Sequence, residues 1–537
     1  MNQVEVKRRQ IEIGSCIIGL INILVFGSKL GNNGIAYLAI AMEAYGFFLT
    51  ISSGCLSDTL GKMLRSRIAK GQYKNSMCVR RRILVFQGSI GVVCSILLAS
   101  FSGVLAQRLF GVSHSTFILL ILSPALTLRA ISAVLIGSFQ GEGTELPAAV
   151  AAPLRQLLIM LSGLFFVKAL GNYGTKVSML LGDDSYIAMY GGVGIAIAIV
   201  LAEVFVVIFL TVIALGSKKS VRRREQEGMR QTDSFVNTVK ILYSSMGMKL
   251  LLQIFELLPI WIGTVFYRKG VLDLSSFTET FGLLTGKFTV LCGFPVALIG
   301  VISVPMLNGV IGAYRREDYR GARNLFQCGL HMISAHGVFF TIFAAIMAGH
   351  LSGMVSGTDN AVLIGLLRCG SSLIALLPLY FFLSRFLMRM GRQYHLLGCL
   401  GLTNILFVLV LSVLLNKGTA GVQALVYAAV TAVAFACVIT GFLSLKLLHT
   451  GINWLRIFAV PLGAGCVAGL FSMFLGKLFV PHLGYLVTVF ICLVLSFMLY
   501  WLVLILCRSF REQDLEHIPG GALIRAAGQT LRVFYSE

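Results

Sequence analysis

Long runs of apolar residues, separated by short polar or basic clusters, extend along nearly the whole chain. The runs show no strand-like alternation, and each is about 20 residues long, which is the length that an α-helix needs to cross a bilayer. Roughly fourteen such runs can be distinguished. The pattern therefore predicts an all-α polytopic membrane protein with about 14 transmembrane helices.

The predicted spans follow one another with short connections. The first seven lie near residues 11–30, 35–59, 83–106, 116–139, 148–170, 187–215 and 236–266. The second seven lie near residues 277–304, 325–348, 361–386, 396–415, 422–447, 455–479 and 483–507.

Composition supports a lipid environment. Hydrophobic residues make up 57% of the 537 positions and charged residues only 12%, whereas about 25% of the residues in an ordinary soluble domain are charged. The mean hydropathy is +0.88. Because one soluble core could not absorb this much apolar surface, the solvent of most of the chain is expected to be lipid.

The basic residues indicate the orientation. Most of the 44 Lys and Arg residues fall in alternate connections between the predicted spans, and cytoplasmic loops are the ones enriched in these residues. Both termini are therefore predicted to be cytoplasmic. The net charge of +22 is explained by contact with anionic membrane lipids, and no soluble segment is long enough to read nucleic acid.

The sequence offers little for covalent chemistry. The twelve cysteines are scattered without a C-x-x-C pair, and His331 and His336 have no H-E-x-x-H context. The glycine-rich stretch from Gly137 to Gly143 is expected in a short loop between two spans, without the strand that phosphate binding needs. We therefore expect no enzyme, no metal site and no bound cofactor, apart from coupling to Na⁺ or H⁺.

A faint duplication suggests two lobes. The basic segments 65–74 and 314–323 occupy equivalent places after the second and eighth spans, although two basic cytoplasmic loops would look the same without any repeat. Paired bundles are a common framework for alternating access. The predicted parts are an N-terminal six-helix lobe at 1–216, a basic cytoplasmic linker at 217–235, a C-terminal six-helix lobe at 236–447, two additional transmembrane helices at 448–507 and a cytoplasmic tail at 508–537.

Several motifs then resemble a known family. They are Gly31-Asn-Asn-Gly-Ile-Ala-Tyr37 with Leu49-Thr-Ile-Ser-Ser-Gly54, the Gly137–Gly143 stretch with Pro147, Leu284-Thr-Gly-Lys287 with Pro295 and Pro305, and Asp514-Leu-Glu-His-Ile-Pro-Gly-Gly521. In this order they resemble the polysaccharide biosynthesis and lipid II flippase proteins of the multidrug/oligosaccharidyl-lipid/polysaccharide exporter superfamily, and the tail resembles the sporulation stage V protein B branch. The resemblance implies a bacterial plasma-membrane exporter that meets polysaccharide or peptidoglycan synthesis machinery.

The chain also departs from that family. Ile136 stands where the family's R-G-x-x-Q-G segment has arginine, Arg155 where its E-Q pair has glutamate, and Ile159 where a further arginine is usual. At the end of the first helix Lys29 is the nearest cation. The resemblance therefore implies fold and transport class more strongly than it implies lipid II itself.

Ionisable residues inside the spans are the candidate site residues, because burying a charge in lipid is costly unless it is paired or faces water. In the seventh span Lys249, Gln253 and Glu256 fall on one helix face, as do Ser15, Asn22 and Lys29 in the first. The expected substrate-binding cations are Lys29, Arg129, Arg155, Lys249, Lys287 and Arg368. The expected ion-coupling carboxylates are Glu43, Glu203 and Glu256. The alternative is that these residues form structural pairs between helices or snorkel to the headgroups.

Fixed cations in a water-filled cavity suit a phosphate or diphosphate headgroup. The sequence thus predicts a flippase or exporter that moves a polyprenyl-diphosphate-linked saccharide, a cell-wall or surface-polysaccharide precursor, by alternating access between the lobes. One alternative is a cation-coupled multidrug exporter of the same superfamily, which would prefer an acidic or aromatic cavity. The other is a membrane-embedded lipid-sugar transferase, which would cluster Asp, Glu or His at a membrane face.

Overall fold

The computed structural model describes residues 3–216, 233–271, 273–357, 359–418, 421–451, 453–510, 521 and 525–526. All regular secondary structure in these ranges is helical, which confirms the expected all-α polytopic membrane fold. Most of the predicted basic linker at 217–235 and of the predicted tail at 508–537, including nearly all of the motif at 514–521, lies outside the described residues.

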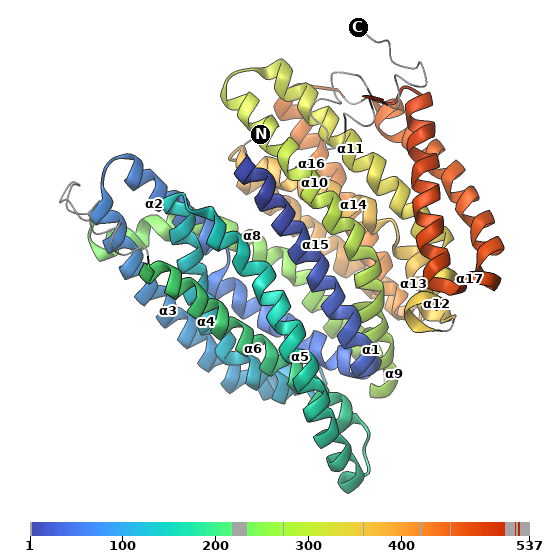
Figure 1. The fold of residues 1–537 in the computed structure, drawn as a ribbon, viewed down its shortest axis with the longest axis horizontal. Helices are drawn as coiled ribbons and strands as arrows, with labels where there is room; N and C mark the ends of the chain where they lie inside the picture. The colour runs from blue at the N-terminus through green and yellow to red at the C-terminus, as the bar shows by residue number, and fades with distance from the viewer. Residues whose placement is uncertain are drawn as a thin grey trace. The chain divides into compact units, whose positions relative to one another are not determined.

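The helices follow one another with short connections (Figure 1). In the first half they are α1 (Gln3–Ser53), α2 (Leu56–Ala69), α3 (Tyr73–Gly103), η1 (Val104–Leu109), α4 (Ser115–Glu142), α5 (Glu145–Leu181), α6 (Ser185–Gly216), α8 (Phe235–Gly270) and α9 (Leu274–Gly282). In the second half they are η2 (Leu283–Phe288), α10 (Thr289–Arg315), α11 (Tyr319–Ile346), α12 (Ala348–Ser356), α13 (Ala361–Gly370), α14 (Leu373–Arg389), α15 (Gln393–Asn416), α16 (Gln423–Leu448), η3 (Leu455–Ala459) and α17 (Val460–Leu506). The segments η1, η2 and η3 are π-helical.

Two of these helices contain a sharp break. The 51 residues of α1 would measure roughly 75 Å as one straight helix, more than twice the hydrocarbon core of a bilayer. At Gly31 the backbone leaves helical geometry with φ 66° and ψ −177°, a conformation that glycine adopts without steric cost. Gly484 breaks α17 in the same way, with φ 71° and ψ 169°. Each of these two helices is therefore two spans joined at a glycine.

The number of spans follows from these breaks. Within the described ranges, twelve helices are long and apolar enough to cross a membrane, and the two halves of α17 count as two of these twelve. Helices α13 and α14 form a bent pair, which makes thirteen if the pair is taken as one span. One of the twelve, Ile17–Ala69, contains the break at Gly31. Splitting it there gives fourteen, in the order that the hydrophobic runs predict.

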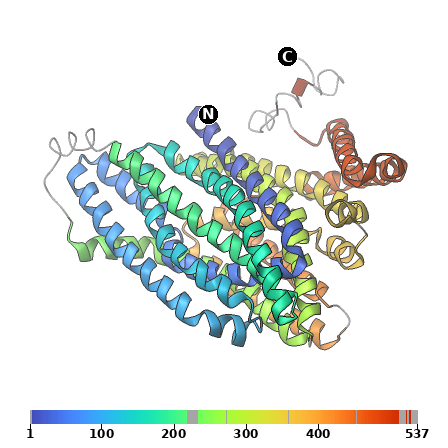
Figure 2. The ribbon, with the colours of Figure 1, turned by 60° about the horizontal axis from the view of Figure 1, so that its bottom comes forward.

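The chain forms two compact units, Met1–Gly286 and Lys287–Glu537. In the N-terminal unit α4 is central, since it contacts α1, α2, α3, α5 and α6. The blue to green helices of Figures 1 and 2 run alongside one another in this unit. Helices α8 and α9, which the sequence analysis places in the second lobe, pack on α1, α2 and α3 here. The division into six-helix lobes stays a prediction.

The glycine-rich stretch from Gly137 to Gly143 is not the loop that the sequence suggested. It forms the last turns of α4, and only Gly143, with φ 80°, leaves the helix. A Cβ at Gly137 would lie 2.8 Å from the Ser57 carbonyl oxygen, and one at Gly141 would lie 2.6 Å from Leu64 Cβ. These glycines allow α2 and α4 to pack closely, as small residues do between membrane helices.

In the C-terminal unit α11 has the central place. It packs on α10, α13, α14 and α17, and Gly465 and Gly469 of α17 lie against Ile342 of α11. Farther along, the buried Tyr500 hydroxyl donates a 2.6 Å hydrogen bond to the carbonyl oxygen of Ala335. Both halves of α17 therefore belong to the body of this unit.

Candidate functional site

Three of the predicted interior residues meet in the N-terminal unit. Glu203 of α6 is almost fully buried, and its Oε1 lies 2.6 Å from Arg155 Nε of α5 and 3.2 Å from Arg129 Nη1 of α4. We call Arg129, Arg155 and Glu203 the charge cluster. Tyr45 of α1, which is also buried, lies near all three side chains.

Local packing explains how charges come to lie this deep. Helices α5 and α6 approach each other closely, since a Cβ at Gly194 of α6 would lie 2.8 Å from the Phe166 carbonyl carbon of α5. Close approach of α5 and α6 brings Arg155 onto the carboxylate. Because an isolated charge in such a place would be very costly, the two ion pairs offset part of the cost of burying these side chains.

The charge cluster is not neutral. Two guanidinium groups share one carboxylate, so the cluster carries one net positive charge. Among the described residues, Arg155 Nη2 and Glu203 Oε2 are buried with no hydrogen-bond partner. The Arg129 side chain keeps 31% of its surface exposed, whereas Arg155 keeps only 11%. Arg129 is therefore the more accessible of the two arginines, and the donor atom that Arg155 leaves without a partner is suited to an anion.

A polar contact between α1 and α5 adjoins the charge cluster. Asn22 is buried, and its Nδ2 donates to the backbone oxygen of Gln156 at 2.9 Å and to Gln156 Oε1 at 3.0 Å. Gln156 follows Arg155 directly in the sequence. Of the polar face predicted for the first helix, Asn22 is thus turned inward, whereas Lys29 is exposed.

The other predicted carboxylates lie elsewhere in the same unit. Glu43 Oε1 accepts a 3.0 Å hydrogen bond from Thr264 Oγ1 of α8, and the backbone oxygen of Glu43 accepts one from Trp261 Nε1. Glu43 Oε2 is buried without a hydrogen-bond partner in the described ranges. Glu256 is exposed.

The remaining predicted cations do not join the charge cluster. Lys249 of α8 is half-buried and has no ion pair with any described residue. Lys287 belongs to the C-terminal unit, where its Nζ donates a 3.0 Å hydrogen bond to Ser356 Oγ. Arg368 is exposed. The structure therefore brings three of the nine predicted site residues together in the charge cluster and places the other six outside it.

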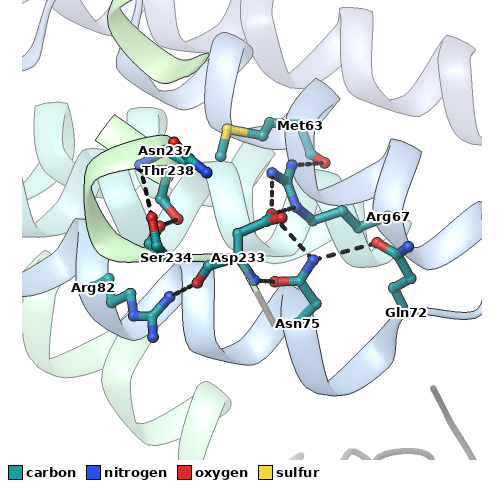
Figure 3. A network of polar contacts seen from close by, with 9 residues as sticks. All are labelled: Met63, Arg67, Gln72, Asn75, Arg82, Asp233, Ser234, Asn237 and Thr238. Atoms are coloured by element: carbon teal, nitrogen blue, oxygen red, sulfur yellow. Dashed lines mark hydrogen bonds and ion pairs between the residues drawn. The ribbon is translucent and has the colours of Figure 1, made fainter. Parts of the chain in front are cut away.

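A polar network that the sequence analysis did not identify joins α2, α3 and the start of α8 (Figure 3). Arg67 Nη2 lies 2.7 Å from Asp233 Oδ2, and Asn75 Nδ2 donates to the same oxygen at 3.1 Å. Arg82 donates to the Asp233 backbone oxygen. The sequence signal was the run of arginines between residues 65 and 82, which indicated the orientation and the faint repeat but not the contact with Asp233.

The described residues do not indicate a metal centre. No group of three or more His, Cys, Asp or Glu side chains in these ranges is placed to hold a metal ion.

Comparison with known proteins gives distant sequence relatives. No family model matches the chain. Stage V sporulation protein B of Bacillus subtilis (strain 168) is 19% identical over 351 residues, which are 64% of each chain. Lipid II flippase MurJ of the same organism is 22% identical over 191 residues, or 34% of this chain and 35% of the relative. The chain thus aligns with less than two thirds of either relative.

Solved structures match over more of the chain. The inward closed conformation of lipid II flippase MurJ has a TM-score of 0.64 at 12% identity, covering 93% of this chain and 98% of that one. An inward-facing multidrug resistance MATE family transporter of the MOP superfamily has a TM-score of 0.61 at 13% identity, covering 82% and 95%. The chain has the fold of these transporters.

Proposed function

We propose that the protein is a flippase or exporter that moves a polyprenyl-diphosphate-linked saccharide across the membrane by alternating access. The observation that carries the proposal is the charge cluster, in which Arg129 and Arg155 share the single carboxylate of Glu203 inside the N-terminal unit. The net positive charge there is suited to the anionic headgroup of such a lipid.

The chemistry of the charge cluster supports binding and not bond breaking. A guanidinium group can hold two phosphate oxygens at once, and Arg129 presents a partly exposed one. Glu203 lies 2.6 Å from Arg155 Nε and holds that guanidinium group beside it. Since flipping a lipid changes no covalent bond, the site needs only to bind and release the headgroup.

The comparisons support this class of substrate. A lipid II flippase appears both among the sequence relatives and among the structural neighbours. From these relatives we extend to this chain a lipid-linked saccharide as cargo, and contact with polysaccharide or peptidoglycan synthesis machinery as the context of transport.

Coupling to an ion gradient belongs to the same proposal. Of the carboxylates predicted to bind Na⁺ or H⁺, Glu203 is held by two arginines and Glu256 is exposed. Glu43 is within a span and has no ion pair in the described part of the chain. We therefore assign the coupling role to Glu43.

The test is leaflet exchange in liposomes. Purified protein is reconstituted with a fluorescent lipid-linked oligosaccharide, and outward exposure is followed with a membrane-impermeant quencher. We expect Arg129→Gln to slow exchange at least about tenfold, the equivalent of one lost charge-assisted contact. The exposed Arg316→Gln variant serves as the matched loss of one positive charge. Exchange by Arg129→Gln at the wild-type rate would contradict the proposal.

One observation favours a second function. The TM-score to the MATE transporter, 0.61, is close to the 0.64 for the lipid II flippase, so the fold also suits a cation-coupled multidrug exporter. A cationic drug would be repelled by the charge cluster. If the same liposomes export a cationic dye, and if Arg129→Gln exports it as fast as the wild type, the multidrug exporter would be favoured.

A further inference from the structure

A second basic site lies at one end of the C-terminal unit. A cavity of about 700 Å³ opens where α10 and α14 meet the first turns of α11 and α15 and the last turn of α16. That volume is within the usual range for small-molecule sites. None of the residues that line it belongs to the charge cluster.

Three cations, Arg323, Arg392 and Lys446, line this cavity, which we call the basic pocket. Arg392 and Lys446 are exposed and have no ion pair with any described residue. Arg323 is oriented by a 2.8 Å hydrogen bond from its Nε to the Leu448 carbonyl oxygen at the end of α16. No carboxylate is among the described residues that line it. The pocket therefore holds uncompensated positive charge, arranged by the ends of separate helices.

Tyrosine and histidine side chains complete the wall of the pocket. Tyr314 and Tyr319 pack edge to face with ring centroids 5.4 Å apart, and His395 and His449 face the same cavity. Hydroxyl and imidazole groups beside guanidinium and ammonium groups provide the kinds of donor that hold phosphate oxygens.

The start of α15 adds a further feature that favours an anion. Arg392 is the N-cap residue of this 24-residue helix, and its side chain makes no capping hydrogen bond. The first backbone N–H groups of a helix lack internal partners and carry partial positive charge, and bound phosphate often satisfies them. At the neighbouring start of α11, by contrast, Asp318 Oδ1 already accepts a hydrogen bond from the Gly321 backbone.

We propose that the basic pocket binds a phosphate-bearing anion, either a free diphosphate or the headgroup of an anionic phospholipid. This site is additional to the transport site and does not depend on the proposed function. The charge pattern of the sequence puts this end of the unit on the cytoplasmic side, where both kinds of phosphate are available.

The test compares two double variants that remove the same charge. Arg392→Gln with Lys446→Gln removes the two exposed cations of the basic pocket. Arg316→Gln with Arg320→Gln removes two exposed cations from the adjoining turn and first turn of α11, neither of which lines the cavity. Arg323 is left in place because its hydrogen bond to Leu448 stabilises the fold locally. Thermal unfolding of both variants in detergent confirms that they are folded.

Two probes distinguish the source of the phosphate. The first is inorganic pyrophosphate, titrated by calorimetry into protein in neutral detergent. The second is a nanodisc of phosphatidylglycerol and phosphatidylcholine, in which the retained phosphatidylglycerol is counted by mass spectrometry. For whichever probe binds the wild-type protein saturably, we expect the pocket variant to bind about tenfold more weakly or worse and the control variant to change less than about twofold.

The outcomes of the two titrations distinguish a free phosphate compound from a lipid headgroup. Loss of pyrophosphate binding in the pocket variant alone would identify a site for a free phosphate compound, and loss of phosphatidylglycerol alone would identify a lipid site. The proposal is overturned if the wild-type protein binds neither probe saturably, or if both variants weaken binding equally, since surface charge alone would then explain it.

Discussion

At the scale of single residues, Glu203 determines the electrostatics of the N-terminal unit. Its side chain is only 3% exposed and compensates two arginines, of which Arg155 is far more buried than Arg129. Removing one partner of a buried pair is costly because it leaves the other charge uncompensated. The three members should therefore differ in their contributions to stability and to transport.

Replacing Glu203 by Gln should be the most destabilising change in the charge cluster. It leaves Arg155 buried without a counter-charge, and we expect a loss of roughly 3 to 5 kcal/mol in the free energy of unfolding. Adding Arg155→Gln to Glu203→Gln should restore part of that loss. Chemical unfolding in detergent measures all three proteins, and equal stability of the single and double variants would show that Arg155 does not depend on the carboxylate.

Arg129→Gln should behave differently. Glu203 keeps Arg155 as its partner at 2.6 Å, and Arg129 is partly exposed, so we expect a stability change of less than about 1 kcal/mol together with the loss of lipid exchange described above. A large loss of stability instead would assign Arg129 a structural role. Unfolding and exchange must be measured on the same preparation.

The sequence identified Arg129, Arg155 and Glu203 individually, because ionisable residues stand out within apolar runs. It did not pair them. They lie on three different helices, and which faces meet depends on how α4, α5 and α6 rotate against one another. That rotation is set by close contacts such as Gly194 against Phe166, which hydrophobic periodicity does not encode.

At the scale of helices, glycines determine how closely neighbouring spans pack. A Cβ at Gly194 would meet the Phe166 carbonyl carbon at 2.8 Å and the Val167 nitrogen at 2.9 Å. Both atoms are backbone and cannot move aside without shifting α5. By contrast, a Cβ at Gly88 of α3 would find nothing within 4 Å.

We therefore expect opposite results from two alanine substitutions. Gly194→Ala should lower the free energy of unfolding by about 1 to 3 kcal/mol through overpacking, whereas Gly88→Ala should raise it by up to about 1 kcal/mol through backbone entropy. Unfolding curves in the same detergent provide the comparison. If both variants gained stability, α5 and α6 could not be in close contact at Gly194.

The Asp233 network makes the start of α8 sensitive to acid. The hydrogen bond from Arg67, with help from Asn75 and from the charge of Arg82, holds the pKa of the Asp233 carboxyl below its ordinary value. Because the pKa is lower in the folded state than in the unfolded state, the ionised carboxylate stabilises the fold above pH 4 or so. That contribution is lost as the pH falls through the folded pKa.

Asp233→Asn should accordingly lower the unfolding temperature at pH 7, and the difference from wild type should shrink as the pH approaches 3. The matched control is Asp359→Asn, which changes an exposed aspartate between α12 and α13. A difference that stayed constant with pH would mean that the carboxylate charge of Asp233 does not contribute.

Sequence reasoning located most helices but not all of their ends. Hydropathy marks only the part of a helix that lies in lipid, so the span predicted at 83–106 is the middle of a helix that begins at Tyr73. The Gly137–Gly143 stretch was taken for a loop because glycine is common both in turns and at close helix contacts. Only the position of α2 beside this stretch shows that its glycines serve a close helix contact and not a turn.

At the scale of the whole molecule, the sequence predicted the membrane spans better than it predicted which spans belong to each compact unit. Long apolar runs predicted the number of spans because lipid permits few other structures. The place of α8 and α9 with the N-terminal unit was not predicted, because the repeat was inferred from loop charges such as those near Arg316. Loop charges report the side of the membrane and not which helices pack together.

The side of the membrane is itself the last prediction. Arg316 lies in the turn before α11, and Asp359 follows α12; both are exposed. Among the described residues between them, α11 is the one helix that is long and apolar enough to cross a membrane. The excess of arginine around Arg316 puts that turn in the cytoplasm. Single cysteines at these positions, in a chain whose native cysteines are replaced, should react differently with an impermeant maleimide. In intact cells the cysteine at 359 should be labelled, whereas the one at 316 should be labelled only after permeabilisation. Labelling of both from outside would mean that α11 does not cross the membrane, and the reverse pattern would mean that both termini face outward.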